Sequence, residues 1–336
     1  MTTTDSPPVD EASPPPRPRA TRRRSTGDTE RGFSRVFRWI AIGAGATILA
    51  MLAAVALFLL FRAWPALTAG QAELAEAVPR YPDDTSFFQY VGPLVFGTLL
   101  AAVIALALAT PVAMGIALFI SHYAPRRLAQ LLGYLVDLLA AIPSVIYGLW
   151  GFLVLAPVLK PLWDWLNAYL GWIPLFAGEV STTSKSIATV GVVLAVMILP
   201  IITAVSREVF LQTPKLHEEA ALALGATRWE MVRTAVLPFG RSGVVSAAML
   251  GLGRALGETM AVLMILSPGF TYSSHILEAA KHQTIAAYIA LDFPEASGLA
   301  VNALIATGLA LFVITLAVNV FARWIIARRK EFSGAN

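Results

Sequence analysis

Apolar residues form six long runs along the chain, and short polar segments separate them. The runs lie near residues 39–61, 90–120, 128–157, 187–206, 242–267 and 299–322. Each is long enough to cross a bilayer, which takes about 20 helical residues. Lipid offers no hydrogen-bond partners to an open backbone, so spanning segments fold as helices. The runs are apolar on every side, which excludes the alternating strands of a membrane β-barrel. The pattern predicts an all-α integral membrane protein with six transmembrane helices.

The first 38 residues have a different composition from the rest of the chain. They hold six prolines by Pro18 and the basic run Arg22–Arg24, with no sizeable apolar cluster. Such a segment buries too little apolar surface to repay its ordering entropy. We expect a disordered, basic leader over 1–38, a retained first transmembrane helix over 39–61 and a helical core over 90–325. The apolar run at 39–61 is too long for a cleaved signal peptide.

Composition removes several classes of function. The chain has 336 residues, of which 57% are apolar and 14% charged, whereas soluble domains carry about a quarter charged residues. There is no cysteine, so disulfides and thiolate metal sites are excluded. The four histidines are not spaced as a metal-binding pair on a helix. Basic residues lie between the apolar runs rather than in one patch, which argues against nucleic acid.

Lysine and arginine are distributed unevenly between alternate loops. With the N-terminus inside, the inner segments hold 19 of these residues and the outer segments hold 5. Cytoplasmic loops carry the basic excess in membrane proteins. We therefore expect both termini to be cytoplasmic, with the basic leader close to acidic lipid headgroups.

The cytoplasmic segment 213–238 carries strong signals for helix boundaries. In chain order these are an N-cap, a proline at the first helical position, a left-handed glycine at the helix end, a capping box and a final stop. The residues are Thr213, Pro214, Gly225, Thr227 with Glu230, and Pro238. The segment is predicted to form two short helices. They are either an ordinary surface hairpin or a docking element for a partner protein, and the residues alone leave both readings open.

Two charged residues lie inside the fifth apolar run. Arg254 and Glu258 are four apart, which places them on one face of a continuous helix. Small residues extend that face: Gly243, Ala247, Gly251 and Ala261. Charges at this depth are costly and often mark a substrate pathway. The pair is either an internal ion pair that helps helices pack, or an anion site in which Arg254 binds phosphate or sulfate oxygens while Glu258 holds its guanidinium ready.

The third apolar run contains a carboxylate and a proline. Asp137 is expected to hold helices together by pairing with a polar group. Pro143 is expected to kink the helix and free backbone groups near Ser144. Asp137, Pro143 and Ser144 are therefore candidates either for packing or for a gate.

The loop between the fourth and fifth runs resembles a known motif. Glu219-Ala220-Ala221, followed by Gly225 and later by Leu237-Pro238, is similar to the EAA motif of ABC importer permeases. Ala235 departs from the motif, which usually has isoleucine there. The resemblance implies the type I importer (MetI-like) fold and a coupling helix that docks on a separate ATPase. It makes Glu219, Ala220, Ala221 and Gly225 the coupling positions.

Two further segments resemble phosphate importer permeases. Residues 251–262, Gly-Leu-Gly-Arg-Ala-Leu-Gly-Glu-Thr-Met-Ala-Val, are similar to the fifth-span signature of that branch. Residues 141–148, Ala-Ile-Pro-Ser-Val-Ile-Tyr-Gly, resemble a second signature. The ending of the first segment looks more like the PstC-type subunit than its PstA-type partner. The resemblance implies that Arg254 and Glu258 take part in phosphate transport.

The same resemblance implies a set of partners. They are a PstA-type permease that completes a heterodimer, PstB-type ATPase subunits, a PstS-type extracytoplasmic phosphate-binding protein and inorganic phosphate, all at a bacterial inner membrane. None of the five lysines follows a glycine, so the chain lacks the Gly-Lys pair of a phosphate-binding Walker A loop. It is expected to be no enzyme and to hold no cofactor, with ATP and Mg²⁺ used by the ATPase.

Three alternatives stay open on the residues alone. The first is a permease of the same architecture for sulfate, molybdate or another oxyanion. The second is an anion transporter or channel that works without an ATPase, which would predict paired repeats with broken helices. The third is an intramembrane enzyme, which the chain disfavours because it has no cysteine and no histidine inside a predicted span.

Overall fold

The computed structural model describes residues 27–78 and 85–330, with side chains described for 36–78 and 85–324. Over these residues the chain is almost entirely helical, and one isolated antiparallel bridge joins Ser186 to Ala279. Six helical runs are long and apolar enough to cross a membrane: Val36–Thr68, Phe87–Tyr123, Ser144–Leu170, Ile187–Leu211, Arg228–Leu256 and Leu299–Trp324. The predicted all-α fold with six membrane helices is confirmed.

The helices follow one another with short connections. The α-helices are α1 Gly27–Thr68, α2 Gln71–Ala77, α3 Phe87–Leu118, α4 Arg126–Ala140, α5 Ser144–Trp150, α6 Ala156–Leu170, α7 Ile187–Leu211, α8 Lys215–Ala223, α9 Arg228–Met231, α10 Leu237–Leu256, α11 Met260–Ile265, α12 Ile285–Asp292 and α13 Leu299–Lys330. Three π-helical turns lie between some of them: η1 Phe119–Tyr123, η2 Gly151–Leu155 and η3 Val232–Val236.

The chain divides into two compact units, residues 1–55 and 56–336. The described part of the first unit is helical, because α1 begins at Gly27 rather than at residue 39. Residues 27–38 contain no proline, so a helix nucleated in the apolar run extends by one hydrogen bond per residue. The predicted disorder of the leader therefore does not hold for 27–38. The rest of the leader, residues 1–26, lies outside the described residues.

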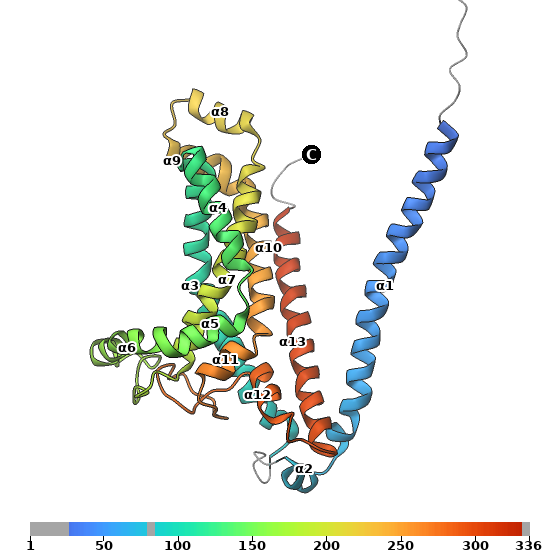
Figure 1. The fold of residues 1–336 in the computed structure, drawn as a ribbon, viewed down its shortest axis with the longest axis vertical. Coiled ribbons are helices and arrows are strands. Elements are labelled where there is room, and N and C mark those ends of the chain that lie inside the picture. The colour runs from blue at the N-terminus through green and yellow to red at the C-terminus, as the bar shows by residue number, and fades with distance from the viewer. Residues whose placement is uncertain (1–26, 79–84, 331–336) are drawn as a thin grey trace, which may run out of the picture. The chain divides into compact units, whose positions relative to one another are not determined.

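The core of the second unit is built around α7, which packs against α3, α4 and α10 (Figure 1). Alanines repeat every four residues along α3 and form a stripe that is at most 1% exposed: Ala101, Ala105, Ala109, Ala113 and Ala117. Small residues at this spacing let two helices approach closely. Gly191 of α7 shows the same principle, because a Cβ there would lie 2.3 Å from Cγ2 of Ile104.

The third predicted span, 128–157, is not one helix. α4 ends at Ala140, and α5 begins at Ser144 and continues through η2 into α6. Pro143 supplies no N–H and disfavours a helical conformation for the residue before it. The predicted kink at Pro143 is therefore a complete break, and the long apolar run of this region is Ser144–Leu170.

Two non-helical segments, residues 171–186 and 266–284, lie at the end of the core opposite α8 and α9 (Figure 1). Backbone hydrogen bonds join them: Ser181 N–H donates to Leu277 at 3.1 Å, and Ile276 N–H donates to Leu175 at 3.1 Å. We call them together the outer segments. The helix α12 follows the second outer segment, and its first residue is bonded to α3, because Thr98 Oγ1 accepts from the N–H of Ile285 at 3.0 Å.

Candidate functional site

The fifth membrane helix is broken just after Arg254. α10 ends at Leu256, Gly257 and Glu258 form the break, and α11 begins at Met260. Glu258 is 7% exposed, and its Oε1 accepts a hydrogen bond from the N–H of Ala261 at 3.1 Å. Its carboxylate therefore caps α11, because it accepts from an N–H that the first helical turn leaves free.

This break overturns the expected arrangement of Arg254 and Glu258. The two do not share one face of a continuous helix, and no ion pair joins them among the described residues. Arg254 is half-buried in the last turn of α10, where the helix dipole favours a positive charge. The interpretation as an internal ion pair is therefore wrong, and the Arg254 guanidinium has no carboxylate partner in the part of the chain that the structure describes.

The two signature segments of the sequence meet in space. α5 packs on α11, and the approach is close because a Cβ at Gly148 would lie 2.7 Å from Cα of Ala261. Tyr147 is buried beside this contact and lies within electrostatic reach of Arg254. Its hydroxyl donates to the carbonyl of Leu139 at 2.8 Å, which bridges the break at Pro143. Residues 141–148 and 251–262 therefore form one site.

The predicted small face of α10 is used for close packing. A Cβ at Gly251 would lie 2.9 Å from Ile202, and a Cβ at Gly243 would lie 2.5 Å from Val209. Gly240, which the sequence analysis missed, meets Phe210 at 2.7 Å in the same way. The face lies against α7, and Ala261 lies on α11, where it packs on α5 instead.

The other candidates of the third run are less enclosed. Asp137 and Pro143 are exposed and Ser144 is half-buried. Among the described residues no hydrogen bond or ion pair is recorded for Asp137. Over residues 27–78 and 85–330 it joins no two helices, so its predicted packing role would need water or another chain.

The loop between α7 and α10 has most of the predicted features. Gly225 has φ +86°, and bonds from Gly225 N–H to Leu222 and from Ala226 N–H to Ala221 form a Schellman motif. Thr227 and Glu230 form a complete capping box.

Two details of this loop differ from the prediction. The N-cap of α8 is Pro214, and the hydroxyl of Thr213 is buried without a hydrogen-bond partner. Pro238 does not stop the second helix, because α9 continues through η3 into α10 with Pro238 in its first turn. A π-helical turn shifts the bonding pattern by one residue, which lets a helix run past a residue without an N–H.

The coupling positions predicted by resemblance lie mostly at the surface. Glu219, Ala220 and Gly225 are exposed, and Ala221 is half-buried against the cluster of Met231 and Val232. No residue of α8 is buried. The predicted positions are therefore available to a partner chain.

The sequence analysis missed a group of polar residues in the outer segments. Glu278 lies 3.1 Å from His275 Nδ1 and 3.2 Å from Lys281 Nζ. Burial raises the pKa of Glu278, but the hydrogen bonds from Lys281 and His275 outweigh burial, so the pKa is below its ordinary value. Burial lowers the pKa of His282, which stacks on Phe96. The only signal in the sequence was spacing, because His275 and Lys281 each lie three residues from Glu278.

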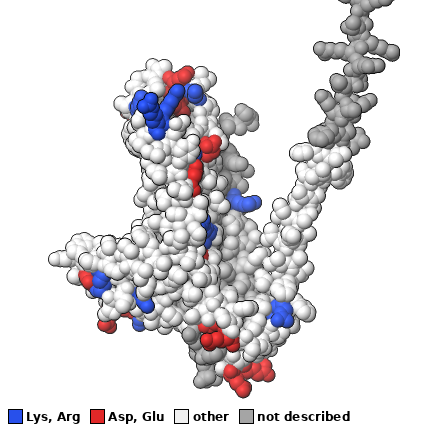
Figure 2. All heavy atoms as spheres, viewed as in Figure 1, with Lys and Arg blue, Asp and Glu red and all other residues white. Residues whose placement is uncertain are grey.

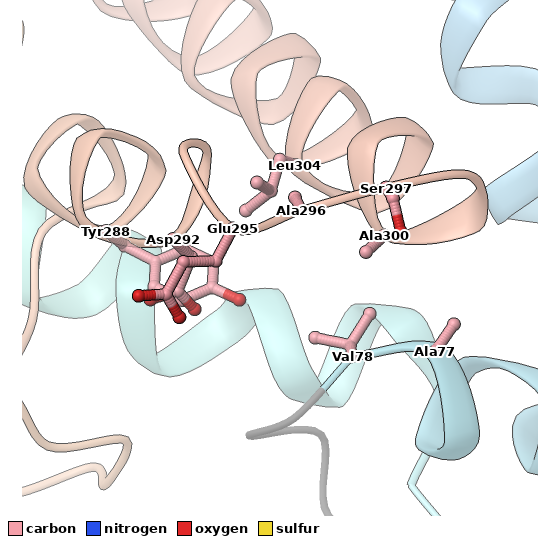
Figure 3. A pocket seen from close by; sticks show the side chains of 9 residues that line it. All are labelled: Ala77, Val78, Tyr288, Asp292, Glu295, Ala296, Ser297, Ala300 and Leu304. Atoms are coloured by element: carbon pink, nitrogen blue, oxygen red, sulfur yellow. The ribbon is translucent and has the colours of Figure 1, made fainter.

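One cavity of about 150 Å³ lies at this same end of the core, between α2, α12 and the start of α13. Figure 3 shows the side chains of Asp292 and Glu295 close together beside Tyr288. The lining residues are Ala77, Val78, Tyr288, Asp292, Glu295, Ala296, Ser297, Ala300 and Leu304. Two carboxylates and no basic residue among these make the cavity unsuited to an anion. It does not contain Arg254.

Charge on the described surface is concentrated at the ends of the core. Figure 2 shows basic side chains gathered over the end that carries α8 and α9, and acidic side chains near α2 and α12. On the face shown, the surface between them is mostly uncharged apart from a narrow strip of charged side chains (Figure 2), as expected for a lipid-facing belt.

The fold and these motifs define the class: a multi-span helical membrane protein whose two signature segments pack together, with an exposed helical loop between two late spans. The model of the family described as "Binding-protein-dependent transport system inner membrane component" matches residues 109–331. The chain belongs to this family.

The relatives agree with that membership. The chain is 50% identical over 304 residues to "Phosphate transport system permease protein PstC 2" of Mycobacterium tuberculosis, covering 86% of this chain and 90% of the relative. It is 37% identical over 306 residues to "Phosphate transport system permease protein PstC" of Mesorhizobium japonicum, covering 89% and 92%. A bacterial alginate ABC transporter in complex with an alginate-bound periplasmic protein is 17% identical, with a TM-score of 0.49 over 89% of this chain and 99% of that chain.

Proposed function

We propose that this chain is a permease subunit of an ATP-driven importer of inorganic phosphate and forms half of the translocation path. One observation carries the proposal: relatives that the chain matches at 37–50% identity over 70–90% of its length are named phosphate transport permeases. Family membership supports the coarser role of a membrane transport subunit.

Arg254 is the group that we propose to meet the anion. It is half-buried in a membrane helix and has no carboxylate partner among the described residues. A guanidinium offers a planar pair of donors that suits two phosphate oxygens. An anion beside it would supply the countercharge that the chain does not.

Glu258 then has a different task from the one its spacing suggested. Its carboxylate fixes the break between α10 and α11 by accepting from Ala261. The break places Arg254 at the end of α10, within electrostatic reach of Tyr147 in α5. Glu258 therefore belongs to the substrate pathway as the residue that positions Arg254.

The region around Pro143 is the part that we propose to act as a gate. Asp137 and Ser144 lie on either side of the break between α4 and α5. The hydroxyl of Tyr147 in α5 donates a hydrogen bond to the carbonyl of Leu139 in α4 and so connects the two helices across the break. An exposed carboxylate on a membrane helix is stable beside water or a partner chain. Asp137 on the path would repel a phosphate that moved before Arg254 held it.

The ATPase would dock on α8 and the turn that follows it. Leu216 and Leu224 are 73% and 90% exposed, and a short helix with exposed leucines fits a groove on a partner. The movement of the ATPase during its cycle would be transmitted to the membrane helices by Glu219, Ala220, Ala221 and Gly225. ATP and Mg²⁺ would be bound by that partner, so this chain would act without a catalytic residue or cofactor of its own.

The excess of Lys and Arg on alternate loops supports an orientation with both termini in the cytoplasm. The outer segments would then face an extracytoplasmic phosphate-binding protein of the PstS type. A PstA-type permease would supply the other half of the path and complete a heterodimer.

The test is uptake of radiolabelled phosphate by proteoliposomes that hold this chain with its partner subunits and the binding protein. The proposal predicts saturable uptake that requires ATP, that tenfold excess sulfate or molybdate does not reduce, and that Arg254→Gln abolishes at equal protein level. Competition by sulfate would reassign the substrate to another oxyanion. Uptake without ATP would contradict the importer mechanism.

A further inference from the structure

The helix α8 contacts a part of the chain far from it in sequence. His122 Nε2 lies 3.5 Å from Glu218 Oε1. The His122 side chain is 8% exposed and that of Glu218 is 24% exposed, so the contact is sheltered from water. A sheltered contact between a ring nitrogen and a carboxylate is screened less than one at the surface.

The local structure of η1 aims the ring of His122 at α8. The π-helical turn ends α3 and shifts its last residues by one position relative to an α-helix. Ser121 Oγ lies 2.7 Å from Nδ1 of His122. The same hydroxyl donates to the carbonyl of Leu118 at 3.3 Å. Ser121 therefore holds the ring through Nδ1, and Nε2 faces Glu218.

The rest of α8 is weakly attached to the protein. None of its residues is buried, and it is bounded by Pro214 on one side and by Gly225, with φ +86°, on the other. Its other packing contact with the core is through the half-buried Ala221. Without a further contact, α8 would be free to tilt about its two ends.

α3 connects this contact to the opposite end of the core. The helix runs from Phe87 to Leu118 and leads directly into η1. Toward its other end, a Cβ at Gly97 would lie 2.2 Å from the carbonyl oxygen of Gln283 in the outer segments, and Thr98 accepts from the N–H of Ile285, the first residue of α12. One helix, with Pro111 inside it, thus leads from the contact with α8 at η1 to a contact with the outer segments at Gly97.

We propose that His122 and Glu218 fasten α8 to the end of α3, so that the two move as one body. Movement that an ATPase imposes on α8 would then reach the outer segments through α3, as well as through α7 and α10, to which α8 is joined by the chain. Glu218 and His122 are positioning residues for this step. The inference rests on the proposed function, because a docked ATPase is what would move α8.

The absence of cysteine in the chain permits a direct test. In the variant His122→Cys/Glu218→Cys, the reconstituted complex is treated with a short bifunctional thiol reagent. Phosphate uptake and ATP hydrolysis are measured in the same vesicles. We expect the untreated variant to transport at least fivefold less phosphate per ATP than the original complex, and the cross-linked variant to regain at least half of the original ratio.

Two results would overturn the proposal. If the cross-linked variant hydrolyses ATP without transporting phosphate, α8 must move relative to α3. An untreated variant with the original phosphate-to-ATP ratio would mean that the contact has no part in coupling. Each single cysteine variant, treated in the same way, controls for the reagent. If the original complex itself does not transport phosphate, the proposed function fails instead.

Single substitutions separate coupling from folding. His122→Ala is expected to lower the ratio of phosphate to ATP, and His122→Gln to restore most of it, because its amide can donate to Glu218. The double variant His122→Ala/Glu218→Ala should be no worse than either single variant. His217→Ala, an exposed histidine on the same helix, is the matched control. An equal loss in His217→Ala would contradict a specific link between His122 and Glu218.

Discussion

The contact between α5 and α11 gives the sharpest structural prediction. Gly148 packs against the backbone of Ala261, and a Cβ at position 148 would lie 2.7 Å from Cα of Ala261 and 3.2 Å from Sδ of Met264. Carbon atoms in contact prefer about 3.5–4.0 Å. Gly148→Ala therefore requires the two helices to separate by about 1 Å.

The size of the effect follows from two opposing contributions. Overpacking of a close contact costs about 1–3 kcal/mol, whereas replacing a helical glycine by alanine stabilises a helix by roughly 1 kcal/mol. Gly115→Ala provides the matched control, because Gly115 is also helical and a Cβ there has no atom within 4 Å. The difference between the two variants isolates the overpacking cost, which corresponds to a factor of about 5–150 in an equilibrium constant.

The assay is thermal unfolding of the purified complex in detergent, together with phosphate uptake at equal protein level. Gly148→Ala should unfold at a lower temperature than Gly115→Ala, and its maximal uptake rate should fall at least fivefold because Tyr147 and Arg254 move apart. If the two variants had the same unfolding temperature and the same uptake, the packing argument would be refuted.

Three further predictions follow from single contacts. Glu258→Ala leaves the buried N–H of Ala261 without its acceptor, at a cost of roughly 1–3 kcal/mol. It should therefore lower the unfolding temperature more than Glu258→Gln, which keeps an acceptor. Equal unfolding temperatures of the two variants would contradict the capping of α11 by Glu258. Gly225→Ala forces alanine into a left-handed conformation, which costs roughly 1–2 kcal/mol, and should weaken co-purification of the ATPase. Gly225→Asn should have a smaller effect. Undiminished co-purification of Gly225→Ala would contradict a role of this turn in ATPase docking. The pKa of Glu278 lies below its ordinary value of 4.5, so its contribution to stability is complete above pH 4.5 and is lost as the pH falls through the folded-state pKa. Glu278→Gln should therefore flatten the acid limb of the stability profile, and an unchanged limb would exclude this group.

Predictions that depend on a few neighbouring residues agreed with the structure. The left-handed Gly225 and the capping box of Thr227 and Glu230 are present, because both signals are satisfied by backbone groups within four residues. The number of membrane runs also agreed, although the bounds of the third and fifth differ, since lipid imposes a minimum apolar length on any spanning helix.

Predictions that assumed an uninterrupted helix were wrong. The spacing of Arg254 and Glu258 implied a shared face, but α10 ends before Glu258. Gly257 permits a break without requiring one, so the sequence cannot distinguish the two outcomes. At Pro238 the sequence predicted a helix end, whereas the structure has a continuous helical run there, because the π-helical turn η3 leads directly into α10.

Contacts between distant segments could not be predicted from one sequence. Gly148 against Ala261 and His122 against Glu218 depend on how α5, α11, α8 and the end of α3 are placed by the whole core. The signature segments 141–148 and 251–262 were each identified, but their meeting in one site required the structure.

The central claim is that the positive charge of Arg254 handles the transported anion. The most direct measurement uses Arg254→Cys, the single cysteine in this chain, in the reconstituted complex, treated with a cationic or a neutral methanethiosulfonate reagent of similar size. The account predicts that phosphate uptake is lost in Arg254→Cys, is partly restored by the cationic reagent, and is not restored by the neutral one. Uptake that persists in untreated Arg254→Cys, or that the neutral reagent restores equally, would contradict it.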